Sequence, residues 1–186
     1  LLEGGFLVIV VLLLLLGEIS GALIVAAVIP FSMLFAFIGM REFGLAANLM
    51  SLGAIDFGMV VDGSVVMIEN IVHRLQKNKG ENVDDVVISA SKQVVRPIFF
   101  GVLIILMVYV PIMTFSGMEG ILYRPMAITV AAAVLGSLLL ALIFVPAISS
   151  IIFRKGVKVR RNYLIDWIKP RYYRGLDKNL DRRKFV

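Results

Sequence analysis

Residues 55–70 read IDFGMVVDGSVVMIEN, a stretch that is apolar enough for a membrane and yet carries three carboxylates. These acids are Asp56, Asp62 and Glu69. A carboxylate near the centre of a bilayer costs at least about 3 kcal/mol on insertion scales, so such residues usually belong to ion pathways or proton relays. The stretch therefore predicts a membrane helix whose acids take part in transport.

The composition of the whole chain is that of a membrane protein. Of its 186 residues 60% are hydrophobic, whereas a soluble domain is nearer about 45–50% apolar. The chain has no cysteine and a single histidine, which excludes disulfides, thiolate metal sites and histidine-rich metal cages. Its net charge of +6 comes from basic residues that flank apolar runs, which indicates membrane topology and not nucleic-acid binding. We expect no catalytic residues, no enzyme activity and no cofactor.

Five apolar stretches predict five transmembrane helices, at approximately residues 1–16, 21–40, 48–72, 98–115 and 126–148. A helix needs about 20 mostly apolar residues to cross a bilayer, and the alternation typical of membrane strands is absent. The predicted fold is therefore an all-α, polytopic transmembrane helix bundle. Because the chain starts inside an apolar run, we expect it to be a piece of a longer protein.

The basic residues identify the cytoplasmic side of this bundle. Five Lys or Arg lie in 73–97 and twelve in 154–186, whereas the opposite side has only Arg41 and Arg124. By the positive-inside rule, the side that holds 73–97 and 154–186 is cytoplasmic. Residues 154–186 are predicted to form a basic interfacial helix and the lead-in to a further span, with a solvated linker as the alternative.

The spacing of the three acids predicts a ladder and not a chelating site. Asp62 and Glu69 are seven residues apart, which places them on nearly the same helix face and about 10 Å apart along the axis. On a straight helix, Asp56 lies about 9 Å further out and about 120° around. Such a ladder suits stepwise proton transfer, although structural ion pairs within the bundle are the alternative. His73 is expected at the surface, with a role in metal entry as its alternative.

Five short segments carry a resemblance to a known family: NLMSLG at 48–53, VDGSVVMIEN at 61–70, RPIFF at 96–100, FSGMEG at 115–120 and VP at 145–146. In order and spacing they resemble the RND efflux transporters. The resemblance implies that the five spans are the second to sixth helices of a twelve-helix transporter, and so part of its first half. It also implies a homotrimeric proton antiporter of the bacterial inner membrane, working with a periplasmic adaptor and an outer-membrane channel.

The acid pattern further resembles one subfamily. Drug-exporting members typically have two adjacent aspartates, but here Val61 precedes Asp62 and a further acid stands at Asp56. This arrangement is similar to heavy-metal efflux members of the zinc/cobalt/cadmium type, which implies proton or cation translocation by Asp56, Asp62 and Glu69. A copper/silver type is second, with Met67 as a soft-metal contact, because thioethers suit Cu(I) and Ag(I). A drug pump and a purely structural membrane domain remain open alternatives.

Overall fold

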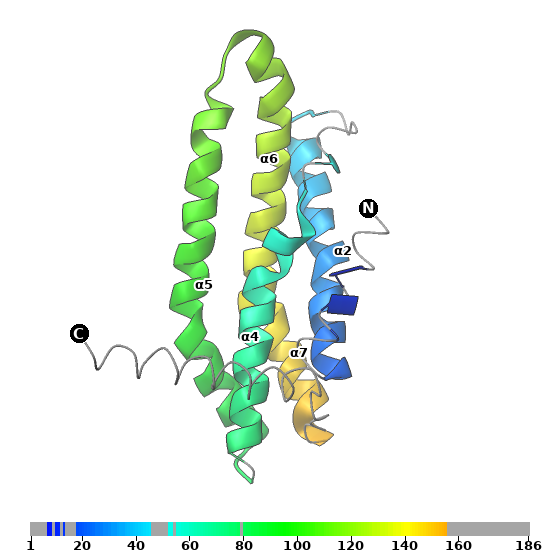
Figure 1. Cartoon of the computed structure of the whole chain (residues 1–186), viewed down its shortest axis with the longest axis vertical. Helices are drawn as coiled ribbons and strands as arrows, with labels where there is room; N and C mark the ends of the chain where they lie inside the picture. The colour runs from blue at the N-terminus through cyan, green and yellow to red at the C-terminus, as the bar shows by residue number, and fades with distance from the viewer. Residues whose placement is uncertain are drawn as a thin grey trace, which may run out of the picture.

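The computed structural model describes residues 18–45, 52–53, 55–78 and 80–155, together with scattered positions between 7 and 13. All regular structure within this described part is helical, and the long helices stand side by side (Figure 1). Their bounds are α2 (Ile19–Glu42), α4 (Phe57–Lys77), α5 (Val83–Met113), α6 (Gly117–Leu139), a π-helical turn (Leu140–Phe144), α7 (Val145–Ile152) and a 3-10 turn (Phe153–Lys155).

Three helical segments are long and apolar enough to cross a membrane: α2, α5 and the continuous run Gly117–Ile152. They contain or overlap the predicted spans 21–40, 98–115 and 126–148, so the all-α polytopic fold is confirmed. α4 has 21 residues, which is enough for a span, but its charged side chains lower its hydropathy. The predicted span 1–16, apart from its scattered described positions, and the predicted tail 154–186 beyond 155 lie outside the described residues.

Helix α5 begins much earlier than its predicted span. Asn82 caps its first turn by accepting a hydrogen bond from the backbone N–H of Asp84 at 3.3 Å, and acids in the first turn complement the helix dipole. At 31 residues, α5 is about 46 Å long, whereas the hydrocarbon layer is about 30 Å thick. Its first turns therefore extend from the membrane on the cytoplasmic side, where the sequence predicted a connecting segment.

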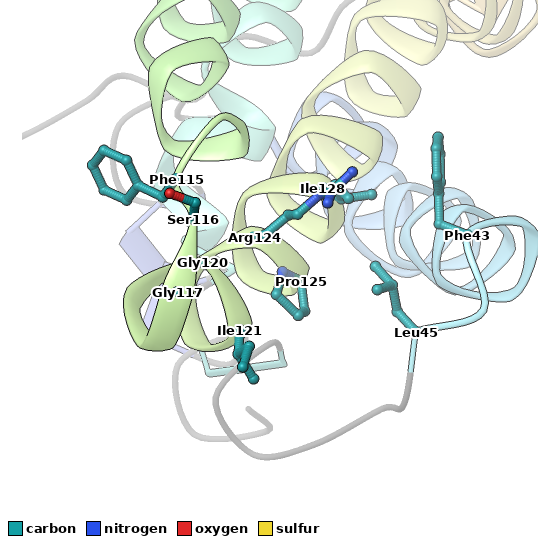
Figure 2. Close-up of a pocket in the computed structure, with 10 residues that line it drawn as sticks. All are labelled: Phe43, Leu45, Phe115, Ser116, Gly117, Gly120, Ile121, Arg124, Pro125 and Ile128. Carbon is teal, nitrogen blue, oxygen red and sulfur yellow. The ribbon is translucent and has the colours of Figure 1, made fainter.

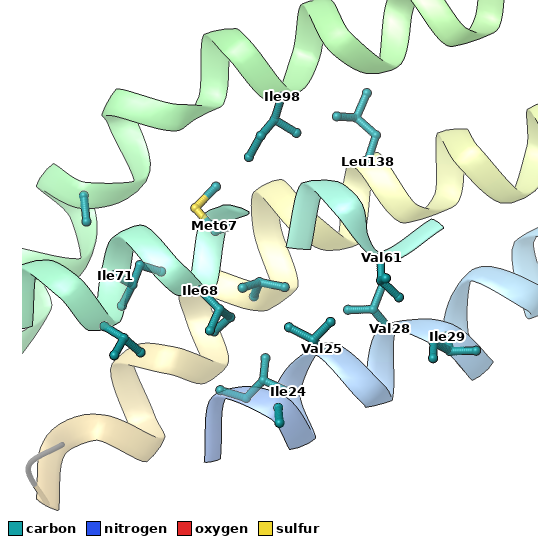
Figure 3. Packing of buried hydrophobic residues seen from close by; sticks show 14 of the residues in the cluster. Ile24, Val25, Val28, Ile29, Val61, Met67, Ile68, Ile71, Ile98 and Leu138 are labelled. Carbon is teal, nitrogen blue, oxygen red and sulfur yellow. The ribbon is translucent and has the colours of Figure 1, made fainter. Parts of the chain in front are cut away.

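The core lies where α2, α4, α5 and α6 meet. Figure 3 shows buried side chains from all four helices, including Val25, Ile68, Ile98 and Leu138. Association of helices in lipid depends on van der Waals packing, because lipid is as apolar as these side chains. Glycine makes this packing close: a Cβ added to Gly39 would lie 2.6 Å from the Cβ of Ala132. The backbones of α2 and α6 therefore touch at a distance that larger residues would prevent.

The second half of the last long helical run contains one wide turn. Residues 140–144 are π-helical and lead directly into α7, whose first turn contains Pro146. Proline has no N–H to donate to the preceding turn, which makes a local change of helix type inexpensive there. Through this turn the buried positions are Ala141, Val145, Ser149 and Phe153, at intervals of four residues.

Candidate functional site

The helix that carries the acids begins one residue after Asp56. Asp56 has an extended backbone (φ −86°, ψ 115°), and its Oδ1 accepts a hydrogen bond from the N–H of Gly58 at 2.8 Å. Its predicted position on one straight helix with Asp62 is therefore wrong, because its carboxylate caps the helix instead. Asp56 remains exposed at the start of α4, which lies partway down the bundle in Figure 1.

Asp62 and Glu69 share one face of α4, as their spacing predicted. Both side chains are exposed, as are those of Val66 and His73 on the same face. The opposite face is buried, and its members are Val60, Val61, Ser64, Met67, Ile68, Ile71 and Val72. The helix therefore has a packed face and an open face, and the two acids stand on the open one.

A pocket of about 280 Å³ lies beside Asp62, between α4 and α5. Pro97 and Gly101 line it from α5. Next to Asp62, a Cβ added to Gly63 would lie 3.0 Å from Cγ2 of Ile98 and 3.5 Å from the Cβ of Ala141 in the π-helical turn. Glycine at 63 thus lets α4 sit close to both neighbours and fixes where the Asp62 carboxylate emerges.

A second pocket, of about 390 Å³, lies nearer the cytoplasmic end of the same two helices. Its lining includes Val66, Glu69 and His73 of α4 and Val94 of α5. Asn70 also lines it and donates from Nδ2 to the backbone carbonyl of Ala90 at 2.7 Å. This hydrogen bond ties α4 to α5 and holds the open face of α4 in register with α5.

The described residues give the three predicted acids no basic partner. The ion pair found there joins Arg154 to Asp84 at 3.3 Å, far along the chain from the acids of α4. The same part of the chain contains no group of three His, Cys, Asp or Glu side chains that could hold a metal ion. The site as described is therefore a set of separated carboxylates and not a chelating centre.

Met67 does not face either pocket. Its side chain is completely buried in the core and lies near Ile98 (Figure 3). In this position its sulfur packs against apolar side chains, as a flexible methionine commonly does.

Two further carboxyls lie at the cytoplasmic side. Asp84 accepts a hydrogen bond from the Ser150 hydroxyl at 2.6 Å, and this bond, aided by Arg154, lowers the pKa of the Asp84 carboxyl. Glu18 is only 7% exposed just before α2, and its Oε2 has no hydrogen-bond partner in the described structure. Burial raises the pKa of Glu18. Asp84 therefore joins α5 to α7, whereas Glu18 is a buried acid whose surroundings disfavour its charged form.

A pocket of about 560 Å³ at the other end of the bundle is of a different kind (Figure 2). Its wall includes Phe43 after α2, Phe115 before α6, and Ile121 and Arg124 of α6. None of its described lining residues carries a carboxylate. It is therefore separate in position and chemistry from the acids of α4.

Comparison with known proteins places this helical arrangement in context. The protein family described as the AcrB/AcrD/AcrF family matches residues 1–186. The chain is 46% identical to the cobalt-zinc-cadmium resistance protein CzcA of Cupriavidus metallidurans, over 97% of this chain and 18% of that protein. It is 38% identical to the cation efflux system protein CusA of Escherichia coli K12, over 78% of this chain and 15% of that protein.

Solved structures agree with these matches. One crystal structure of a heavy metal efflux pump superposes with a TM-score of 0.76 at 42% identity, and covers 96% of this chain and 16% of the pump. A second crystal form gives a TM-score of 0.71 at 46% identity over 82% of this chain and 15% of the pump. The chain thus spans less than a fifth of the length of the relatives that it matches.

Proposed function

This chain belongs to the AcrB/AcrD/AcrF family of RND transporters, and from this premise we propose that it supplies the proton-carrying helices of a heavy-metal efflux pump. The observation that carries the proposal is the position of Asp62. Its carboxylate stands on the open face of a helix in a multi-pass membrane bundle, beside a pocket and without a described basic partner. Inserting a carboxylate into a bilayer costs free energy, so such a residue is expected to serve an ion pathway.

In the proposed cycle, Asp62 takes up a proton from the periplasmic side and releases it toward the cytoplasm. Loss of its negative charge changes how strongly α4 attracts a basic group on the rest of the transporter, and this change would move the helices. Glu69 extends the relay toward the cytoplasm. Asp56 would act as the entry group or would touch the cation, although its use as a helix cap limits its freedom.

The cargo in this proposal is a divalent cation such as zinc, cobalt or cadmium. Two observations support it: the single aspartate at 62 with a further acid at 56, and higher identity to the cobalt-zinc-cadmium protein (46%) than to CusA (38%). The complete pump is further proposed to be a homotrimer of the bacterial inner membrane that works with a periplasmic adaptor and an outer-membrane channel.

The test is Asp62→Asn in the full-length pump, with Asp85→Asn as the matched control. Asp85 is an exposed acid in the first turn of α5 that lines neither pocket on α4. We expect the variant at 62 to fold and assemble normally but to lose zinc, cobalt and cadmium resistance, while the variant at 85 retains it. Unaltered metal efflux with asparagine at 62 would refute the relay, and a strain lacking the gene that became sensitive only to drugs would refute the metal cargo.

A further inference from the structure

The two pockets beside α4 are parts of one groove. Val66 lines both of them, with Asp62 on one side of it and Glu69 and His73 on the other. These four residues follow one another at intervals of four, three and four, which forms a continuous stripe along a helix. Over the 11 residues from Asp62 to His73, the stripe extends about 16 Å, from the proposed relay to the cytoplasmic end of α4.

The α5 wall of this groove offers a hydrogen-bond acceptor to water. Pro97 lines the first pocket, and because proline has no N–H, it cannot bond the carbonyl of Gln93 one turn earlier. A helical carbonyl points toward the nitrogen four residues later, so this oxygen lies on the same side of α5 as Pro97. The groove therefore has polar lining residues towards both ends, Asp62 in the first pocket and Glu69, Asn70 and His73 in the second, and the free Gln93 carbonyl lies on the side of α5 that faces it.

We propose that this groove between α4 and α5 is the route by which protons leave Asp62 for the cytoplasm, and that His73 exchanges them with cytoplasmic water. The inference rests on the proposed function and names a residue that the relay of three acids does not include. Imidazole suits this position because histidine is the side chain that most often shuttles protons near neutral pH. The proton leaves the O–H of Glu69 for the free ring nitrogen of His73, and the resulting ring N–H then gives it to bulk water.

The charged groups around His73 leave the groove itself open. On α4 they are Glu69 within the groove and Arg74 and Lys77 beyond it, and Arg74 donates to the Ser89 hydroxyl of α5 at 3.3 Å. The neighbouring elements contribute Asp84, Asp85, Lys92 and Arg96 of α5, Arg154 after α7 and Glu18 before α2. None of this second set lines either pocket. Asp62 and Glu69 are therefore the acids of the groove, and Glu69 is the one that lines the same pocket as His73.

The first experiment uses the full-length pump in proteoliposomes, with zinc as cargo and a pH-sensitive dye to follow proton flux. His73→Ala should reduce zinc-coupled proton flux by up to about 10²-fold, the scale on which positioned proton-transfer groups act. Imidazole added on the cytoplasmic side should restore the flux, because it replaces the missing proton carrier. The control, Lys77→Gln, changes an exposed residue of α4 outside both pockets and should behave as the wild type. Wild-type flux in the alanine variant, or a loss that imidazole does not restore, would overturn the proposal.

A second variant tests the groove independently of the histidine. Val66 is 44% exposed at the point where the pockets meet, so Val66→Phe should block the groove without disturbing the core. Flux should fall and imidazole should not restore it, whereas Ile88→Phe, at a 53% exposed position of α5 outside the groove, should have no effect. Full flux with phenylalanine at 66 would contradict the route.

Asp62→Asn in the same vesicles separates this inference from the function on which it rests. If Asp62→Asn blocks proton flux but His73→Ala leaves it normal, only the proposed exit route is ruled out. Normal flux with asparagine at 62 would remove the proposed function, and the exit route with it.

Discussion

Gly63 is the position where the packing of α4 can be tested most directly. Gly63→Ala adds a methyl group that would lie 3.0 Å from Cγ2 of Ile98, whereas carbon atoms pack best at about 3.5–4.0 Å. Either the buried Ile98 side chain or the turn of α4 around residue 63 must therefore shift by a few tenths of an ångström, and overpacking of this kind costs about 1–3 kcal/mol. Because the displaced turn also carries Asp62, we expect reduced metal efflux together with reduced stability.

The matched control is Gly101→Ala, on the facing helix and in the wall of the same pocket. A Cβ at 101 meets no atom within 4 Å, so alanine there gains only its higher helix propensity, up to about 1 kcal/mol. In thermal unfolding of the purified full-length protein in detergent, Gly63→Ala should be less stable than the wild type. Gly101→Ala should be at least as stable as the wild type.

A double variant decides whether the clash itself is the cause. Ile98→Ala removes the methyl group that the new Cβ meets, so the cost of Gly63→Ala should shrink when both changes are present. Residues in direct contact show coupling of about 0.5–3 kcal/mol in such cycles. Strictly additive effects, or an alanine at 63 as stable as the alanine at 101, would refute the close-packing argument.

Three further predictions concern a hydrogen bond and two carboxyl groups. Asn70→Ala removes the hydrogen bond to the Ala90 carbonyl and should lower the free energy of unfolding by about 0.6–1.5 kcal/mol, measured by thermal unfolding. Cysteine cross-linking between α4 and α5 would report whether the two helices separate. Glu18→Gln should stabilise the protein at pH 7. Because the pKa of Glu18 is raised, the contribution of this acid to folding stability is lost as pH rises through that pKa. Unfolding curves of the variant and the wild type should therefore coincide below the ordinary pKa of 4.5. Asp84→Asn should destabilise the protein at pH 7, because the Ser150 hydroxyl lowers the pKa of Asp84 and its charged form stabilises the fold. The difference in stability from the wild type should persist down to the ordinary pKa of 3.8. It should disappear only as pH falls through the lowered pKa. A pH-independent difference for either acid would contradict its assignment.

The sequence predicted the membrane-crossing elements because hydropathy is a property of long segments. The runs at 21–40 and 126–148 lie within helical segments of the structure, and 98–115 overlaps the second part of α5. The predicted span at 98–115 leaves out the first turns of α5, because polar residues dilute their apolar signal. A local signal was nevertheless present, since Asn82 followed by two acids is a typical helix start.

For the candidate site, spacing alone predicted that Asp62 and Glu69 share a face, and the structure confirms it. The break at Asp56 was missed because a continuous apolar run predicts one helix, although aspartate is among the residues preferred at a helix N-cap. Which face of α4 is open could not be predicted. Val66 and Met67 are adjacent and equally apolar, yet one is exposed and the other fully buried, and only the neighbouring helices decide between them.

The wide turn at 140–144 has a consequence for how this family of chains can vary in length. A π-helical turn holds one more residue than the α-helical turn that it replaces, so deletion of one residue from Leu140–Phe144 would leave a regular helix and not a gap. The residues after the deletion would keep their present faces, because the wide turn already absorbs the extra residue. Ser150 would then still face Asp84, and Val145 would stay in the core. A chain of this family that is shorter by one residue here would therefore keep the same contacts between α7 and α5.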